Sequence, residues 1–176
     1  MALEPGSPAP DFSLPSTSGR DVSLGSLRGQ KVVLYFYPRD DTPGCTREAC
    51  AFRDNLARVT GAGAVVLGVS KDSPASHAKF RGKYELPFHL LTDADNDVAR
   101  RYQAFGKKTL YGRSFEGTIR TTYLLDEKGR VAAAWSPVKV DGHADAVLAA
   151  LRGERAPSAP PKAAKKPLAK KPAAKK

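Results

Sequence analysis

The chain has 176 residues, of which 41% are hydrophobic and 27% charged, and its formal net charge is +11. This length suits one compact domain followed by a tail and is short for two full domains. No apolar run approaches the ~18 residues that a membrane-spanning helix needs. Residues 1–12 lack the positively charged and apolar regions of a secretory signal. We therefore expect a cytoplasmic protein without membrane contact.

The basic charge is concentrated in residues 156–176, which contain seven Lys, seven Ala and five Pro and no acidic residue. Without these residues, Lys and Arg number 22 against 18 Asp and Glu, a net charge of about +4. The repeated Pro and the near absence of large apolar side chains predict a disordered tail over 154–176, after a folded domain over 1–153. Such a tail either binds nucleic acid weakly and without sequence specificity or only improves solubility. Its lysines are Lys162, Lys165, Lys166, Lys170, Lys171, Lys175 and Lys176.

Predicted strands and helices alternate along the rest of the chain. Short alternating segments predict strands of a hairpin, continuous apolar runs rich in β-branched and aromatic residues predict buried strands, and apolar residues at helical spacing predict helices. In chain order we expect a hairpin at 11–14 and 21–24, a strand at 31–37, a helix at 42–59, a strand at 64–69, a helix at 73–84, a strand at 88–91, a helix at 93–102, strands at 120–125 and 131–135, and a helix at 144–151.

The order of these elements predicts the architecture. A strand, a helix and a second strand in succession form a right-handed crossover with parallel strands. Lys128-Gly129 suits a tight turn between the last two strands, which are therefore antiparallel. We predict an α/β protein with the thioredoxin fold: a central mixed sheet flanked by helices, with a β-hairpin at the N-terminus.

Chemistry is concentrated around Cys45, which follows the strand at 31–37 and lies in the first turn of the next helix. Unpaired backbone N–H groups and the helix dipole at that place favour the thiolate, which is the reactive form of cysteine. Thr42 either directs its hydroxyl toward the sulfur or only caps the helix. The strand end, the helix N-terminus and the nearby Cys50 together favour a nucleophile over a small core residue.

Two separated segments resemble one enzyme family. Residues 38–45 (PRDDTPGC) resemble the Pro-x-x-x-Thr-x-x-Cys active-site motif of the peroxiredoxins. The longer string DDTPGCTREACAFRD (40–54) resembles the peroxiredoxin Q, or bacterioferritin comigratory protein, subgroup. YGRSFEGTIRTTYLLD (111–126) continues a resemblance that covers about residues 5–152. It implies a monomeric peroxidase without a cofactor that reduces hydrogen peroxide and organic hydroperoxides and is recycled by thioredoxin or a similar dithiol.

The resemblance also implies roles for single residues. Cys45 would be the peroxidatic cysteine, and Glu48 the acid that orients an arginine. The rest of the site would be Pro38, Thr42 and Arg120. Backbone N–H groups, a hydroxyl and a guanidinium fork can stabilise the charge that develops when a thiolate breaks an O–O bond. From position alone, however, Arg120 is an ordinary exposed basic residue and Pro38 marks the end of a strand.

Cys50 cannot bond to Cys45 while the helix between them is intact. Five residues along a helix give a rise of ~7.5 Å and a net rotation of ~140°, so the two Cα atoms stand roughly 8.7 Å apart. A disulfide needs less than ~7 Å. If Cys50 resolves a sulfenic acid on Cys45, as the resemblance implies, the first turn must unwind. The alternative is that Cys50 is an inert core residue and a partner's thiol resolves the sulfenic acid.

Other functions are less well supported. The sequence does not favour a zinc site, because C-x₄-C is not a usual zinc spacing and His77, His89 and His143 are scattered along the chain. We expect these three histidines to be surface or cap residues. Trp135 and the aromatic run 35–37 are typical of sheet packing. A disulfide-exchange protein usually carries C-x-x-C, and a non-catalytic nucleic-acid-binding protein would leave residues 38–54 unexplained. The chain has no G-x-G-x-x-G unit for binding NADPH.

Overall fold

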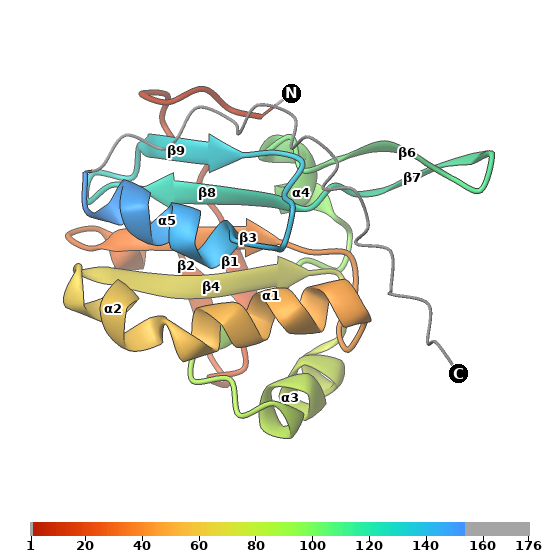
Figure 1. Ribbon diagram of the computed structural model, residues 1–176, viewed down its shortest axis with the longest axis horizontal. Coiled ribbons are helices and arrows are strands. Elements are labelled where there is room, and N and C mark those ends of the chain that lie inside the picture. Colours follow the sequence, from red (N-terminus) through yellow and green to blue (C-terminus); the bar gives the residue numbers. More distant parts are fainter. Residues whose placement is uncertain (1, 154–176) are drawn as a thin grey trace, which may run out of the picture.

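The computed structural model describes residues 2–153, so the predicted disordered tail at 154–176 lies outside the described residues. The predicted α/β fold is confirmed: a five-stranded mixed sheet has the strand order β5-β4-β3-β8-β9 (Figure 1). Three of its strands are parallel: β3 (Lys31–Phe36), β4 (Ala64–Ser70) and β5 (His89–Thr92). The other two are antiparallel to their neighbours: β8 (Thr121–Leu125) and β9 (Val131–Trp135).

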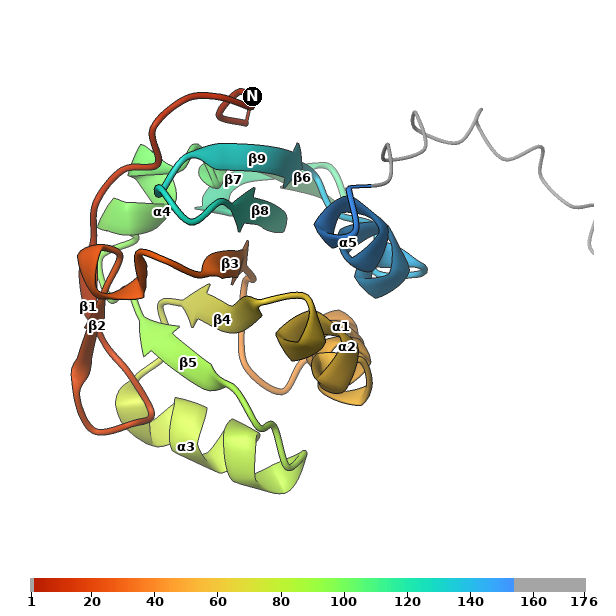
Figure 2. The same cartoon turned by 90° about the vertical axis from the view of Figure 1, so that its left-hand side faces the viewer.

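Helices and a hairpin cover both faces of the sheet (Figure 2). One face is covered by α1 (Pro43–Asp54), α2 (Leu56–Gly61) and α5 (His143–Leu151). The other is covered by the predicted N-terminal hairpin, β1 (Ser13–Pro15) and β2 (Asp21–Ser23), by the short 3-10 helix η1 (Gly25–Leu27) and by α4 (Asp97–Arg101). Next to β5 lies α3 (Pro74–Lys83). A second hairpin, β6 (Phe105–Leu110) and β7 (Arg113–Thr118), projects from the sheet (Figure 1).

The continuous apolar run in β3 is explained by cover on both sides. Val33 and Tyr35 pack into the core under α1 and α5, whereas Leu34 and Phe36 pack into the core under the N-terminal hairpin and α4. A central strand buried on both faces has no polar positions, and so its sequence does not alternate. Its C-terminal end delivers the chain into the loop that leads to Cys45. Among residues 2–153, no helix is both long and apolar enough to cross a membrane.

The helix predicted at 42–59 is in fact two helices, α1 and α2, and this prediction was wrong at Asn55. Asn55 leaves the helical conformation with φ −107° and ψ 7°, and its side-chain amide donates to the carbonyl of Ala51 at 2.8 Å. Asn side chains compete with the backbone for such hydrogen bonds and so favour helix ends. The apolar spacing continues across the break, which is why periodicity alone did not reveal it.

Two further differences lie in the second half of the chain. The predicted helix at 93–102 is shorter, because residues 93–96 form a turn in which the buried Asp93 carboxylate accepts from the N–H groups of Val98 and Ala99. The β6–β7 hairpin was not predicted. Residues 113–116 of β7 are exposed on both sides, so the alternation by which a strand is recognised is absent.

The histidines were also misplaced by the sequence analysis. His77 is completely buried and His143 is 5% exposed, although surface or cap positions were expected. Only His89 is partly exposed. Histidine is intermediate in its preference for the interior, and a buried imidazole needs hydrogen-bond partners from other elements. Such partners depend on how the elements pack, which the local sequence does not show.

We predict that Gly68→Ala destabilises the fold. Gly68 pairs with Tyr35 across β3 and β4, and a Cβ there would lie 2.9 Å from the Tyr35 ring and from Leu90 Cδ2. Forcing a methyl group into such a packed place costs about 1–3 kcal/mol of the free energy of unfolding, measurable by urea denaturation. The control is Gly82→Ala on α3, where a Cβ meets nothing within 4 Å and should add about 0.5–1 kcal/mol. Equal midpoints for Gly68→Ala and the unchanged protein would contradict the prediction.

Candidate active site

Cys45 lies where the sequence predicted, in the first turn of α1. The helix begins at Pro43, and Thr42 before it has extended backbone angles. Pro is well suited to a first helical position, since the N–H that it lacks would have no partner there. The Cys45 side chain is 1% exposed, and both Cys45 and Cys50 are free thiols. The sulfur therefore sits at the positive end of a helix, largely shielded from water.

Arg120 contacts Cys45 from a distant part of the sequence. It directly precedes β8, which pairs with β3, and its Nη2 donates to Cys45 Sγ at 3.3 Å. Its Nη1 donates to Glu48 Oε1 at 3.0 Å. Pairing of β8 with β3 thus brings together residues that are 75 positions apart. The predicted grouping of Cys45, Arg120 and Glu48 is present in the structure.

Gly44 belongs to this arrangement, although the sequence analysis did not single it out. A Cβ at Gly44 would lie 3.1 Å from Arg120 Nη2, so the missing side chain leaves room for the guanidinium. A glycine near the start of a helix weakens that helix by about 1 kcal/mol relative to alanine. A glycine at a position where it weakens the helix indicates that another group approaches the backbone closely.

Glu48 is a carboxyl group held in an unusual environment. It is 1% exposed, and its Oε2 has no hydrogen-bond partner. Burial raises the pKa of Glu48 to about 7, against the opposing charge of Arg120. Burial acts to lower the pKa of Arg120, but the charges of Glu48 and Cys45 have the larger combined effect. The pKa of Arg120 is therefore raised. Glu48 therefore changes its charge near neutral pH, directly beside the group that contacts the sulfur.

The hydroxyl of Thr42 has a different partner from the one proposed. It donates to the carbonyl of Arg39 at 3.0 Å and makes no hydrogen bond that caps α1. A hydroxyl has a single hydrogen, so Thr42 does not donate to the sulfur in this state. Pro38 is half-buried at the start of the same loop. The roles of both residues toward a bound substrate stay predictions.

Lys108, on β6, is a second cation whose charge interacts with those of Arg120 and Cys45, and the sequence analysis missed it. Its Nζ donates to the carbonyl of Thr118 at 2.8 Å. Burial and the charge of Arg120 lower the pKa of Lys108, and the charge of Cys45 acts to raise it. Because the β6–β7 hairpin was not predicted, the sequence analysis gave no reason to connect Lys108 with Cys45.

Cys50 lies on the same unbroken helix as Cys45. It is partly exposed, unlike Cys45, and α1 is helical from Pro43 to Asp54. The separation of roughly 8.7 Å between their Cα atoms follows from helix geometry and exceeds the reach of a disulfide. Within residues 2–153, no group of three or more His, Cys, Asp or Glu side chains is placed to hold a metal ion.

His143 adds a buried titratable group behind the site. Its Nε2 lies 2.8 Å from the Thr122 hydroxyl, and its ring packs edge-on against Phe52 of α1 and against Trp135. Burial and, to a lesser extent, the charge of Arg120 lower the pKa of His143 to about 4. The ring is therefore neutral at physiological pH.

Comparisons with known proteins identify the family that this chain resembles. Residues 5–134 match the AhpC/TSA family. The chain is 41% identical to a Bacillus subtilis protein named peroxiredoxin Bcp over 152 residues, which is 86% of this chain and 97% of that protein. Among solved structures, Xanthomonas campestris peroxiredoxin Q is 43% identical with a TM-score of 0.77, covering 81% of this chain and 90% of that one. A structure described as giving insight into alkyl peroxide reduction by the Xanthomonas campestris bacterioferritin comigratory protein is 42% identical with a TM-score of 0.79, covering 87% and 98%.

We predict that Glu48→Gln makes stability depend more steeply on acid pH. In the folded protein Glu48 takes up its proton near pH 7 but in the unfolded chain only near pH ~4.3, so lowering the pH through this window stabilises the fold. His143 acts in the opposite direction, because it resists protonation down to about pH 4, and lowering the pH below ~6.5 therefore destabilises the fold. Without the Glu48 contribution, the fall in unfolding free energy from pH 7 to 4.5 should exceed that of the unchanged protein by on the order of 3 kcal/mol.

Urea unfolding at several pH values measures this difference. The matched control is His143→Gln, whose stability should instead rise as the pH falls through the same window. Parallel curves for Glu48→Gln and the unchanged protein would show that Glu48 titrates normally.

Proposed function

We propose that this chain reduces hydrogen peroxide and organic hydroperoxides through Cys45. The chain belongs to the AhpC/TSA family and is a peroxiredoxin of the Bcp, or peroxiredoxin Q, group. The observation that carries this proposal is the contact of Arg120 Nη2 with Cys45 Sγ at the N-terminus of α1. A guanidinium and a helix N-terminus together favour the thiolate over the thiol. The chain is accordingly a thiol peroxidase, and the roles of its single residues are proposals.

In the first step, the Cys45 thiolate attacks one oxygen of the hydroperoxide along the O–O axis. An S–O bond forms while the O–O bond breaks, and the leaving oxygen departs as water or an alcohol after it takes up a proton. The sulfur is oxidised to a sulfenic acid and the peroxide is reduced. Arg120, already beside Sγ, can stabilise negative charge on sulfur and on both oxygens, and such preorganised donors contribute most of the rate in many enzymes.

In the second step, we propose that Cys50 resolves the sulfenic acid. Its thiol sulfur bonds to Cys45 Sγ, and the sulfenic oxygen leaves as water. Because α1 holds the two residues too far apart, the first turn of α1 must unwind before the bond forms. A dithiol such as thioredoxin then reduces the disulfide by exchange. The alternative, a partner's thiol in place of Cys50, predicts that α1 stays helical.

We further propose that the protein is a monomer in the reducing cytoplasm, where a thioredoxin-like dithiol is available. Two free cysteines are typical of that compartment. The thioredoxin-like disulfide-exchange function is not favoured, because the relatives are peroxiredoxins and C-x₄-C on a helix cannot bridge without unfolding.

Two cysteine variants test the mechanism. Cys45→Ser should abolish peroxide-dependent oxidation of NADPH in the presence of thioredoxin and thioredoxin reductase, because the attacking sulfur is gone. Cys50→Ser should still consume one equivalent of peroxide at Cys45 but lose sustained turnover. Activity retained by Cys45→Ser would overturn the proposed function. Full turnover by Cys50→Ser would instead show that another thiol resolves the sulfenic acid.

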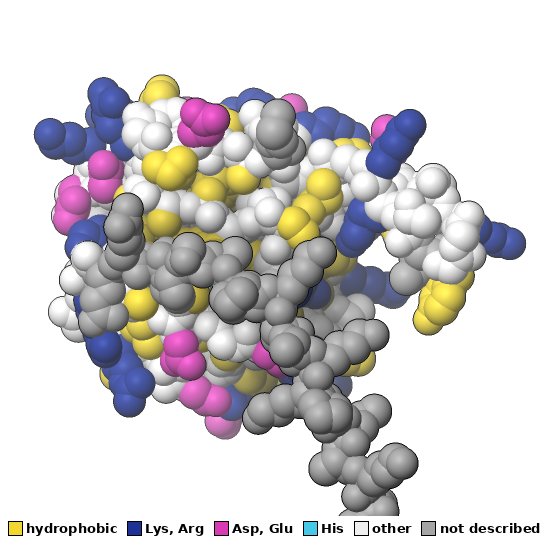
Figure 3. All heavy atoms as spheres, turned by 45° about the horizontal axis from the view of Figure 1, so that its top comes forward, with side chains coloured by type: hydrophobic (Ala, Val, Ile, Leu, Met, Phe, Trp, Pro, Cys, Tyr) yellow, Lys and Arg dark blue, Asp and Glu magenta, His cyan; other side chains and the backbone are white. Residues whose placement is uncertain are grey.

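We also propose that the Lys-rich tail binds nucleic acid weakly and without sequence specificity. The support is compositional: residues 156–176 carry seven Lys and no acid. On the face seen in Figure 3, by contrast, basic and acidic side chains of the folded part are interspersed. Phosphates neutralised by lysines release counterions, so binding of this kind weakens with salt.

Removal of residues 156–176 should eliminate this binding without affecting peroxidase turnover. For the full chain on duplex DNA, the logarithm of the association constant should fall with the logarithm of salt concentration with a slope no steeper than about −6, as seven contacts allow. Fluorescence anisotropy with a labelled duplex measures the slope. Equal binding by the shortened chain would place the interaction on the folded domain, and no binding by the full chain at low salt would leave only a solubility role.

A further inference from the structure

We propose that His77 on α3 is a positioning residue for the peroxidatic loop (residues 38–42), acting through the buried carboxylate of Asp40. The inference rests on the proposed function of Cys45. It adds a role for two residues that lie outside the active-site contacts. Neither His77 nor Asp40 touches Cys45 or Arg120. What they position is the segment from which α1 and its first turn begin.

Asp40 is enclosed by hydrogen-bond partners from three parts of the chain: the end of β3, the segment after β4 and α3. Its side chain is 4% exposed, and its Oδ2 lies 2.7 Å from Nδ1 of His77. Oδ2 also accepts from the Ser76 hydroxyl at 2.9 Å, while Oδ1 accepts from the Tyr37 hydroxyl at 2.6 Å. The backbone N–H of Asp40 donates to Asp72 Oδ2 at 2.9 Å. Such a buried, fully bonded carboxylate has one well-defined place, because any shift would leave a buried charge without partners.

His77 is itself held from two sides. Its Nε2 lies 3.0 Å from the carbonyl of Leu91 on β5, and a carbonyl only accepts, so Nε2 carries a hydrogen. Its Nδ1 faces the Asp40 carboxylate, and a contact of that length between two acceptors requires one proton between them. Because the ring spans from β5 to Asp40, it transmits the position of the central sheet to the peroxidatic loop.

The next residue, Asp41, ties the same loop to α3 at the surface. Its carboxylate accepts from Lys83 Nζ and from the Tyr84 hydroxyl, each at 2.8 Å. Asp41 has φ 56°, in the left-handed region that residues other than glycine rarely adopt. Backbone conformations of this kind persist where the surroundings hold them. The loop is thus held in an unusual shape by α3.

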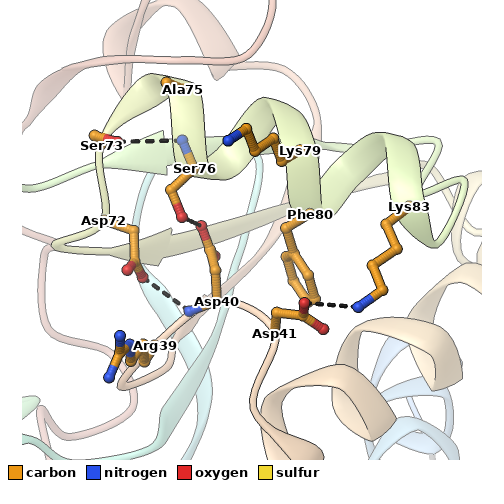
Figure 4. A pocket seen from close by; sticks show the side chains of 10 residues that line it. All are labelled: Arg39, Asp40, Asp41, Asp72, Ser73, Ala75, Ser76, Lys79, Phe80 and Lys83. Carbon is orange, nitrogen blue, oxygen red and sulfur yellow. Dashed lines mark hydrogen bonds and ion pairs between the residues drawn. The ribbon is translucent and has the colours of Figure 1, made fainter.

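Polar contacts, more than continuous apolar packing, connect the peroxidatic loop to α3. Figure 4 shows the loop facing the start of α3 across a cavity of about 410 Å³, with Asp40 bonded to Ser76 and to Asp72. Loss of one such contact therefore loosens the loop without collapsing the apolar core on which α1 rests. Cys45 follows Asp40 by five residues, so its position relative to Arg120 depends on this loop.

The two proposed steps place opposite demands on the loop. Attack on peroxide needs Cys45 held against Arg120 in the intact first turn, whereas disulfide formation needs that turn to unwind. A contact that holds the loop should therefore speed the first step and slow the second. Loss of His77 should slow oxidation of Cys45 about tenfold, the change that ~1.4 kcal/mol produces, and should accelerate disulfide formation.

Stopped-flow fluorescence of Trp135 separates the two rates. Trp135 packs against His143, which packs against Phe52 on α1, so it reports rearrangement of that helix. The oxidation rate is proportional to hydrogen peroxide concentration, whereas the rate of disulfide formation is independent of it. We expect His77→Gln to lower the first rate and raise the second. Ser76→Ala, which removes one hydrogen bond to Asp40, should change both in the same directions by less.

The matched control is His89→Gln, since His89 bonds to Thr17 of the N-terminal hairpin and does not contact the loop. Both of its rates should equal those of the unchanged protein. If His77→Gln slows both steps or changes neither, the positioning role is overturned, and Ser76→Ala decides in the same way if His77→Gln fails to fold. If instead the unchanged protein does not oxidise at Cys45, the proposed function itself fails.

Discussion

The contact between the Arg120 guanidinium and the Cys45 sulfur connects the elements that form the site. It requires β8 to lie beside β3, since only that pairing brings Arg120 to the start of α1. Gly44 leaves room for the guanidinium, because a Cβ there would lie 3.1 Å from Arg120 Nη2. The same guanidinium donates to the buried carboxyl group of Glu48 at 3.0 Å.

One part of the site is held by apolar packing and another by polar contacts. Cys45, Ala49 and Phe52 are buried on one side of α1 and anchor that helix to the sheet. The loop before the helix is instead held by polar contacts to α3. This division suits the proposed reaction, in which the sulfur is first held in place and then released. Apolar packing holds α1 on the sheet, while hydrogen bonds hold the loop that precedes its first turn.

The resemblance of residues 38–54 and 111–126 to one family was sufficient to predict the fold and the peroxidase activity. Local rules also predicted that Cys45 lies in the first turn of a helix and that β3 is buried on both faces. They failed at Asn55, where a side-chain hydrogen bond ends a helix within a continuous apolar pattern. They failed again at the β6–β7 hairpin, because residues 113–116 of β7 are exposed on both sides and carry no alternation.

The sequence was sufficient to single out Cys45 and Cys50 as the residues that we propose carry the chemistry, because the nucleophile, its helix N-terminus and the second cysteine lie within a few positions of one another. The surroundings of these residues depend on how distant parts of the chain pack. The influence of Cys45 on Lys108 and the complete burial of His77, which is bonded to Asp40, arise between elements that meet only after folding. The physical reason is that burial and charge–charge interactions depend on distances in space, and neighbours in sequence do not report those distances.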